Sequence, residues 1–241
     1  MDATKTIMPP EPVRTLGRNH RLFTWSMLVF ASGVVALSSN FLWHDLALYR
    51  LHSAAHAIRF GEPVTTSQLA QVISKVIDWD QAQDLNANDL DDAAQAVSVF
   101  ANRNRGNVFL SPALLATAEK LLKERVALAP ADGNSWLRLA YVRTARVGLD
   151  QLAHDALRMS WLVTPREFSV MWPSLKFRSA HWPEMSVEEQ FAAADLAAGL
   201  WHKPPERDAI KDYLAKLPPH LLATLLADMT DAEAQAALSR P

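Results

Sequence analysis

The sequence predicts an all-α protein, and three features of its composition support that prediction. Only seven glycines and fourteen prolines interrupt the 241 residues, so flexible linkers are few. β-Branched residues are sparse beside alanine, leucine, glutamine, glutamate and arginine, which favour helix. Hydrophobic residues make up 49% of the chain, which is enough to give a helical domain a core. We therefore expect stacked helices rather than a sheet.

Composition also argues against several classes of function. The formal net charge is −2, so no broad positive field is available to hold nucleic acid. The chain has no cysteine, which excludes disulfides, thiolate metal sites and cysteine nucleophiles. Its sequence also lacks the motifs of a nucleophile elbow, a phosphate-binding loop or a dinucleotide fold. We expect no enzymatic activity, no cofactor and no nucleic-acid partner.

An uncharged run near the N-terminus predicts a single transmembrane helix. Residues 22–43 contain no charged side chain, and about 20 apolar residues suffice to cross the hydrocarbon core of a bilayer. A tryptophan lies near each end of the run, where indole rings favour the headgroup region. The residues that mark this predicted membrane anchor are Leu22, Trp25, Phe30 and Trp43.

The charges on either side of the run predict its orientation. Residues 1–21 carry four cations, whereas the first lysine or arginine after the run is Arg50. By the positive-inside rule, residues 1–21 form a cytoplasmic tail and residues 44–241 lie across the membrane. In a bacterium, this arrangement is a single-pass inner-membrane protein with a periplasmic domain.

Two other interpretations of the run stay open. Small residues from Ala36 to Ser38 resemble the cleavage site of a signal peptide, although the apolar run continues beyond them. A buried core helix is the second alternative, but the basic flank and the length of the run favour an anchor.

Apolar side chains at helical spacing predict four helices after the anchor. Residues 44–61 form a predicted juxtamembrane helix, which Gly61 and Pro63 end. The following amphipathic stretches predict helices over residues 65–77, 90–102 and 111–128. Asp91 and Asp92 suit the first turn of the helix that we expect to begin at residue 90.

A helix–turn–helix unit follows, closed by proline. Pro130 and Pro165 lie 35 residues apart, and Gly148 divides the segment between them into two helices. The side chains that repeat at helical spacing are Trp136, Leu139, Ala140, Ala153, Leu157 and Ser160. The unit resembles a tetratricopeptide repeat, whose period is about 34 residues. Ala140 and Arg143 depart from that family's pattern, and a generic helical hairpin is the alternative.

Further helices extend to the C-terminus. We expect a helix over residues 168–178 and another that ends at Trp201. Ser186 and Glu189 have the spacing of a capping box at its start. Residues 62–241 would then form a helical domain similar to a stack of tetratricopeptide repeats.

Two groups of side chains suggest metal chemistry but fit a simpler role. His52 and His56 lie four residues apart on one helical face, yet no HExxH motif or third ligand accompanies them. The aspartates between Asp78 and Asp92 lack the glycine and the spacing of a calcium loop. We expect surface histidines and a solvated turn, and no metal site.

The aromatic stretch from Trp161 to Trp201 is the best candidate for binding a partner. Aromatic side chains beside arginine are frequent where proteins grip partner segments, and outside a membrane they also stack on sugars. The predicted partner-binding residues are Trp172, Arg178 and Trp182.

Segments 129–140, 156–161 and 178–183 make the chain similar to single-span accessory proteins of bacterial exopolysaccharide synthesis and export. That resemblance implies a scaffold that binds protein partners in or at the membrane. A glycan-binding module or a glycan-modifying enzyme is the alternative, with Glu188 or Glu189 as the nearest acids to the aromatic cluster.

Overall fold

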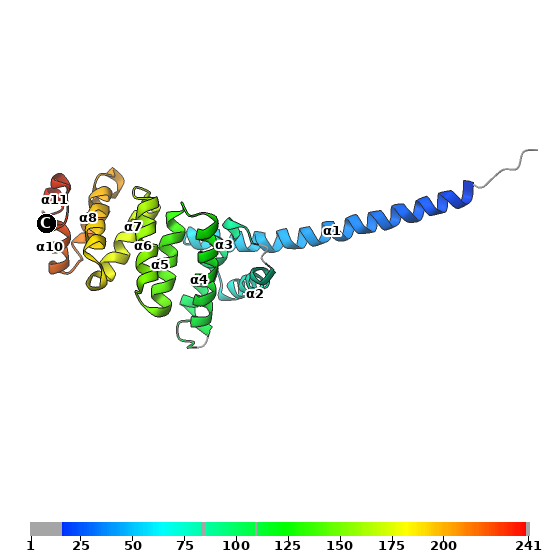
Figure 1. The fold of residues 1–241 in the computed structure, drawn as a ribbon, viewed down its shortest axis with the longest axis horizontal. Coiled ribbons are helices and arrows are strands. Elements are labelled where there is room, and N and C mark those ends of the chain that lie inside the picture. The colour runs from blue at the N-terminus through cyan, green and yellow to red at the C-terminus, as the bar shows by residue number, and fades with distance from the viewer. Residues whose placement is uncertain (1–15, 83–84, 109, 240–241) are drawn as a thin grey trace, which may run out of the picture. The chain divides into compact units, whose positions relative to one another are not determined.

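The computed structural model describes residues 16–82, 85–108 and 110–239. Every regular element in these ranges is a helix, which confirms the all-α prediction. The chain divides into two compact units, Met1–Tyr49 and Arg50–Pro241, with the boundary inside the first helix. Figure 1 shows the helices along the chain, from α1 in blue to α11 in red.

The first helix, α1, spans Leu16–Arg59 and contains both the run predicted as an anchor and most of the predicted juxtamembrane segment. Gly61 follows with a positive φ of 72°, a conformation that ends helices and favours glycine. The side chains of Leu22 and Trp43 lie outside the described residues, whereas those of Trp25 and Phe30 are exposed. Among the residues that the structure describes, no helix combines the length and apolar character needed to cross a membrane.

Three helices occupy the segments predicted after Gly61 and Pro63. They are α2 (Thr66–Ala82), α3 (Ala87–Arg103) and α4 (Leu110–Leu128). The start of α3 differs from the expected residue 90. Asn86 caps α3 by accepting hydrogen bonds from two backbone N–H groups, and the carboxylate of Asp89 accepts one from the backbone N–H of Asn86. Asp91 and Asp92 therefore lie beyond the first turn, where they contact other helices.

These acids attach the end of α1 and the start of the next helical pair to α3. His52 Nδ1 lies 2.7 Å from Asp92, and Arg59 Nη2 lies 2.9 Å from the same carboxylate. Arg138 Nη1 lies 2.7 Å from Asp91. His52 thus takes part in an ion-pair network. No group of three metal-ligating side chains is found within the described ranges.

The predicted helical pair is present as α5 (Gly133–Val147) and α6 (Gln151–Val163). Gly148 separates the helices with a φ of 92°, as the sequence suggested. Asp132 caps α5 by accepting hydrogen bonds from the backbone N–H groups of Asn134 and Ser135. The start of α5 packs tightly on the end of α6, because Gly133 has no side chain there.

A buried carboxylate joins α4 to α5. Glu119 is 3% exposed and pairs with Arg143 at 3.1 Å and with Arg146 at 2.6 Å, and Lys123 lies 2.8 Å away. Burial alone raises the pKa of Glu119, but hydrogen bonds from Lys123 and Arg146 and the nearby cations outweigh it, so the pKa is lowered overall. Glu119 therefore stays ionised.

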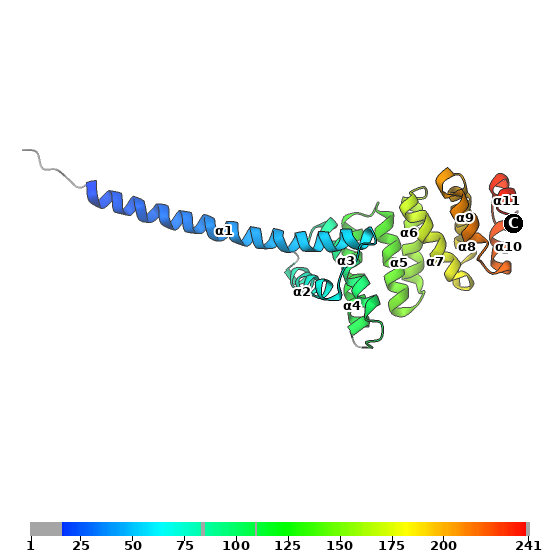
Figure 2. The ribbon, with the colours of Figure 1, turned by 180° about the vertical axis from the view of Figure 1, so that it is seen from behind.

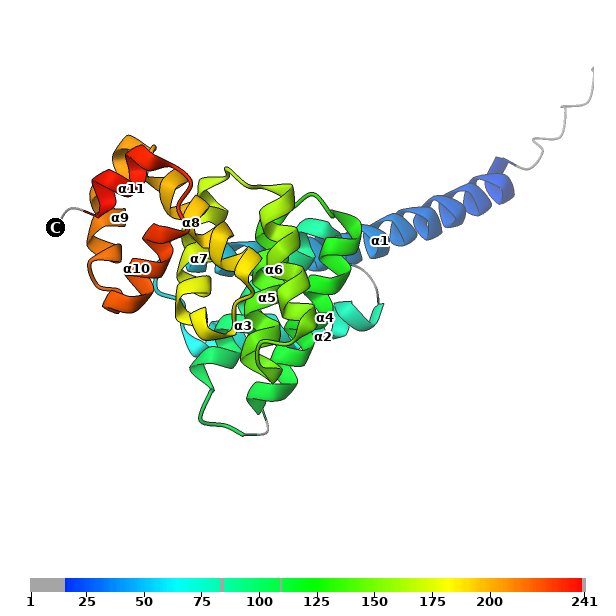
Figure 3. The same ribbon diagram turned by 60° about the vertical axis from the view of Figure 1, so that its left-hand side comes forward.

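The C-terminal part of the second unit has its own core. Figures 2 and 3 show its helices beside the α5–α6 pair and clustered around α8. The elements are α7 (Phe168–Ala180), η1 (Trp182–Glu184), α8 (Val187–Trp201), η2 (Pro204–Glu206), α9 (Arg207–Leu214), α10 (Pro219–Ala227) and α11 (Ala232–Leu238). Leu175, Leu200 and Leu225 are fully buried there. Ser186 and Glu189 form the predicted capping box of α8.

Candidate partner-binding groove

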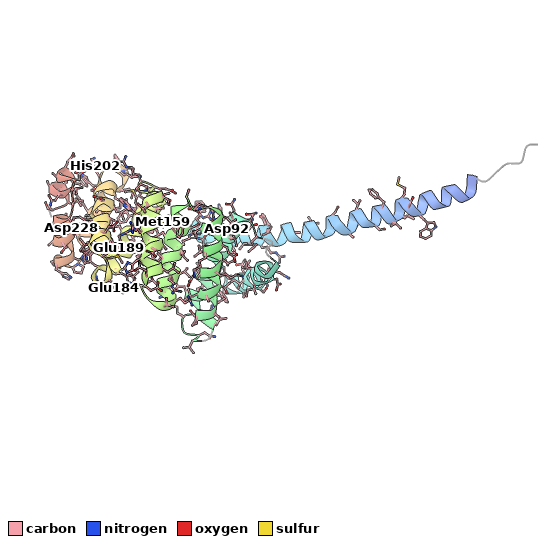
Figure 4. All side chains as sticks on the ribbon, in the orientation of Figure 1. Asp92, Met159, Glu184, Glu189, His202 and Asp228 are labelled. Carbon is pink, nitrogen blue, oxygen red and sulfur yellow. The ribbon has the colours of Figure 1, made fainter. Side chains whose placement is uncertain are left out.

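A groove of about 570 Å³ lies between α6 and the first half of α8, and we call it the α6–α8 groove. Residues 184–186, which lead into α8, and Arg178 of α7 also line it. Figure 4 labels two of its carboxylates, Glu184 and Glu189. The volume is within the range of sites that hold small ligands or short segments of partner chains.

Two helical stripes form the long walls of this groove. On α6, the lining side chains are Gln151, His154, Asp155 and Arg158, and on α8 they are Glu188, Phe191, Ala192 and Asp195. Both sets follow the spacing i, i+3, i+4 and i+7, which places four side chains along one face of a helix. The four α6 positions are therefore all polar, whereas the α8 stripe places Phe191 and Ala192 between its carboxylates Glu188 and Asp195.

Negative charge dominates the groove. Five carboxylates line it, whereas the cations are two arginines, Arg158 and Arg178, and His154 when protonated. Four of the five carboxylates belong to exposed residues, namely Asp155, Glu184, Glu188 and Asp195. Arg158 lies 3.8 Å from Glu188 at the rim, where the energy of an exposed ion pair is small.

The fifth carboxylate, Glu189, is buried and fully engaged. Its oxygens lie 2.8 and 2.9 Å from His154 Nδ1, and it accepts a hydrogen bond from the backbone of Ser186. Because a carboxylate only accepts, Nδ1 of His154 carries a proton. This pair joins α6 to α8 beneath the open part of the groove.

Arg178 is a buried cation in the groove wall. It is 1% exposed, donates to the hydroxyl of Ser174, and lies 3.4 Å from the carbonyl oxygen of Leu157. Its Nε is buried without a hydrogen-bond partner among the described residues. Burial lowers the pKa of Arg178 to about 10, and the charge of Glu189 opposes this only in part. The Nε–H group of this guanidinium therefore has no acceptor among the described residues.

Apolar side chains complete the lining. Phe191 on α8 is 45% exposed, Trp161 at the end of α6 is half-buried, and Met185 is buried at the base. Large aromatic surfaces that stay partly exposed are typical anchor points for a partner. The groove therefore combines exposed carboxylates with apolar and aromatic lining side chains.

Of the three residues predicted to bind a partner, only Arg178 lines this groove. Trp182 is 7% exposed and lies in the C-terminal core. Trp172 packs partly against the same core, donates from Nε1 to Glu206 at 3.1 Å, and meets Tyr213 edge-on at 5.6 Å. Both tryptophans have intramolecular contacts that account for their burial.

Sequence reasoning missed the α6 stripe and the His154–Glu189 pair. The polar residues 151, 154, 155 and 158 have the spacing of one helical face. This spacing is the only feature of the sequence that indicates the stripe. Their partner stripe begins 37 residues further along, at Glu188, and a single sequence does not indicate which helices face each other.

Comparison with protein-family models, with curated proteins and with solved structures finds no match.

Proposed function

We propose that this protein is a non-enzymatic scaffold, held in the bacterial inner membrane by residues 22–43, that binds a partner protein through the α6–α8 groove in the periplasm. Its resemblance to repeat-bearing accessory proteins favours a complex of exopolysaccharide synthesis or export as the setting. The stack of helical pairs in residues 62–241 supplies a rigid surface of the kind that tetratricopeptide repeats use for binding.

The proposal of a membrane anchor rests on the exposure of apolar side chains along α1. Trp25 is 68% exposed and Phe30 is 70% exposed, in a run that contains no charged residue. Apolar side chains on all sides of a helix need an apolar environment, which a core or a bilayer provides. A bilayer also explains the four cations that precede the run.

The observation that favours a binding role over catalysis is the state of Glu189. A glycan-modifying enzyme needs a carboxylate free to exchange protons with its substrate. Glu189, the one buried acid of the groove, is instead engaged with His154 and with the cap of α8. The other four carboxylates are exposed to solvent, unlike the buried general acid of such enzymes. The aromatic and polar lining keeps glycan binding as the second candidate function.

The anchor is tested by extracting membranes with alkaline carbonate. We expect the full chain to stay in the pellet, and Val34→Arg to move most of it to the supernatant, because arginine costs about 3 kcal/mol at the centre of a membrane helix. Ser53→Arg, an exposed position on α1 outside the run, is the matched control and leaves the chain in the pellet. Extraction of the unaltered chain, or a mature N-terminus at Ser39, would contradict the anchor.

A further inference from the structure

We infer that the α6–α8 groove binds a basic peptide segment of the partner, in which lysine or arginine side chains flank an apolar one. The inference deepens the proposed scaffold function, because it names the chemistry of the segment that the groove accepts.

The charge of the groove selects a cationic ligand. Glu189 is already paired with His154, but the carboxylates of Asp155, Glu184 and Glu188 are exposed at the rim. Arg158 is the one exposed arginine among the lining residues, so negative charge remains in excess. Such a rim attracts lysine and arginine side chains and repels an acidic segment.

Arg178 provides a contact that suits a peptide backbone. Arg178 is a lining residue of the groove, and its Nε is a buried donor without a partner among the described residues. A donor left unpaired away from water is unfavourable. A ligand whose side chains are basic has few acceptors except its backbone carbonyl oxygens. A peptide therefore supplies both the cations for the rim and an acceptor for Arg178.

The interior of the groove has room for an apolar side chain between the basic ones. Phe191 and Trp161 offer aromatic surface, and Met185 offers a flexible thioether at the base. Aromatic rings also attract lysine and arginine by the cation–π interaction. A neutral glycan would use the aromatic surfaces and donate hydroxyl groups to the carboxylates, but it would gain no charge attraction from their excess.

The inference is tested by calorimetric titration of the purified full chain in neutral detergent micelles. The probe is a short peptide of alternating lysine and glycine with one central phenylalanine. We expect binding that weakens as NaCl rises from about 50 to about 500 mM, because salt screens the rim charges. The double variant Glu184→Gln/Glu188→Gln should bind the probe about 10-fold more weakly.

Matched controls separate this result from general charge effects. Asp212→Asn/Glu233→Gln removes two exposed carboxylates outside the groove and should change the affinity less than about 2-fold. The inference is overturned if the lysine probe does not bind, if both double variants weaken it equally, or if a glutamate counterpart binds as well. Binding of a neutral glucan oligosaccharide in place of the peptide also overturns it, in favour of the glycan alternative. Carbonate extraction tests only the membrane anchor, whereas the titration tests only peptide binding. A negative result in one experiment therefore leaves the other conclusion intact.

Discussion

Gly133→Ala is expected to destabilise the second unit by about 2 to 3 kcal/mol, because a methyl group has no space between α5 and α6. A Cβ atom at Gly133 would lie 1.7 Å from Thr164 Oγ1, 2.9 Å from Thr164 Cβ and 3.0 Å from the carbonyl oxygen of Ser160. Rotation of Thr164 relieves the first of these contacts. The other two involve atoms that rotation does not move, so the two helices must separate.

Chemical denaturation of the full chain in detergent, followed by circular dichroism, measures this effect. Gly106→Ala is the matched control, because a Cβ there meets no atom within 4 Å, and we expect a change below about 0.5 kcal/mol. Thr164→Ala in the Gly133→Ala background should recover part of the loss, because it removes the shortest contact. An unchanged unfolding midpoint in Gly133→Ala would contradict the close packing of α5 on α6.

Arg178→Met is expected to stabilise the fold by about 1 to 3 kcal/mol, because it removes a buried charge whose desolvation Glu189 offsets only in part. Burial lowers the pKa of Arg178 from its ordinary value to about 10 on folding, so the folded chain holds this proton less tightly. At neutral pH that difference costs about 3 kcal/mol, which is regained only as the pH rises above about 10. Methionine removes the charge and fills similar space, at the loss of the contacts with Ser174 and Leu157.

Arg166→Met is the control for this prediction, since Arg166 is exposed in the connection between α6 and α7. We expect it to change the free energy of unfolding by less than about 0.5 kcal/mol and to leave probe binding unaltered. If Arg178→Met instead lowers the free energy of unfolding, the guanidinium stabilises the folded state. If it raises the free energy of unfolding and leaves the affinity for the probe unchanged, Arg178 does not take part in binding.

Local patterns were sufficient to predict most of the helices. Gly61 and Gly148 end α1 and α5 as expected, and Ser186 and Glu189 cap α8, because turns and caps depend on residues close in the sequence. The start of α3 was placed too late, since asparagine at position 86 is a cap that apolar spacing does not reveal.

The candidate site was harder to predict, because its residues are brought together by packing. Arg178 was identified from its aromatic surroundings, but Trp172 and Trp182 come from the same stretch and face the C-terminal core. Glu206, the hydrogen-bond partner of Trp172, lies 34 residues away. Hydrophobic spacing identifies a buried face but not the helix that covers it.

The most direct test of the central claim is photo-crosslinking from position 191, in carbonate-washed membranes of the cells that make the protein. Phe191 is replaced by p-benzoylphenylalanine in the full chain, and Ala145, exposed on α5, is replaced likewise as the control. The account predicts an adduct at position 191 whose crosslinked peptide carries lysine or arginine, and which the lysine probe displaces. An adduct no stronger than that at position 145, or one joined only to an acidic segment or a polysaccharide, would contradict it.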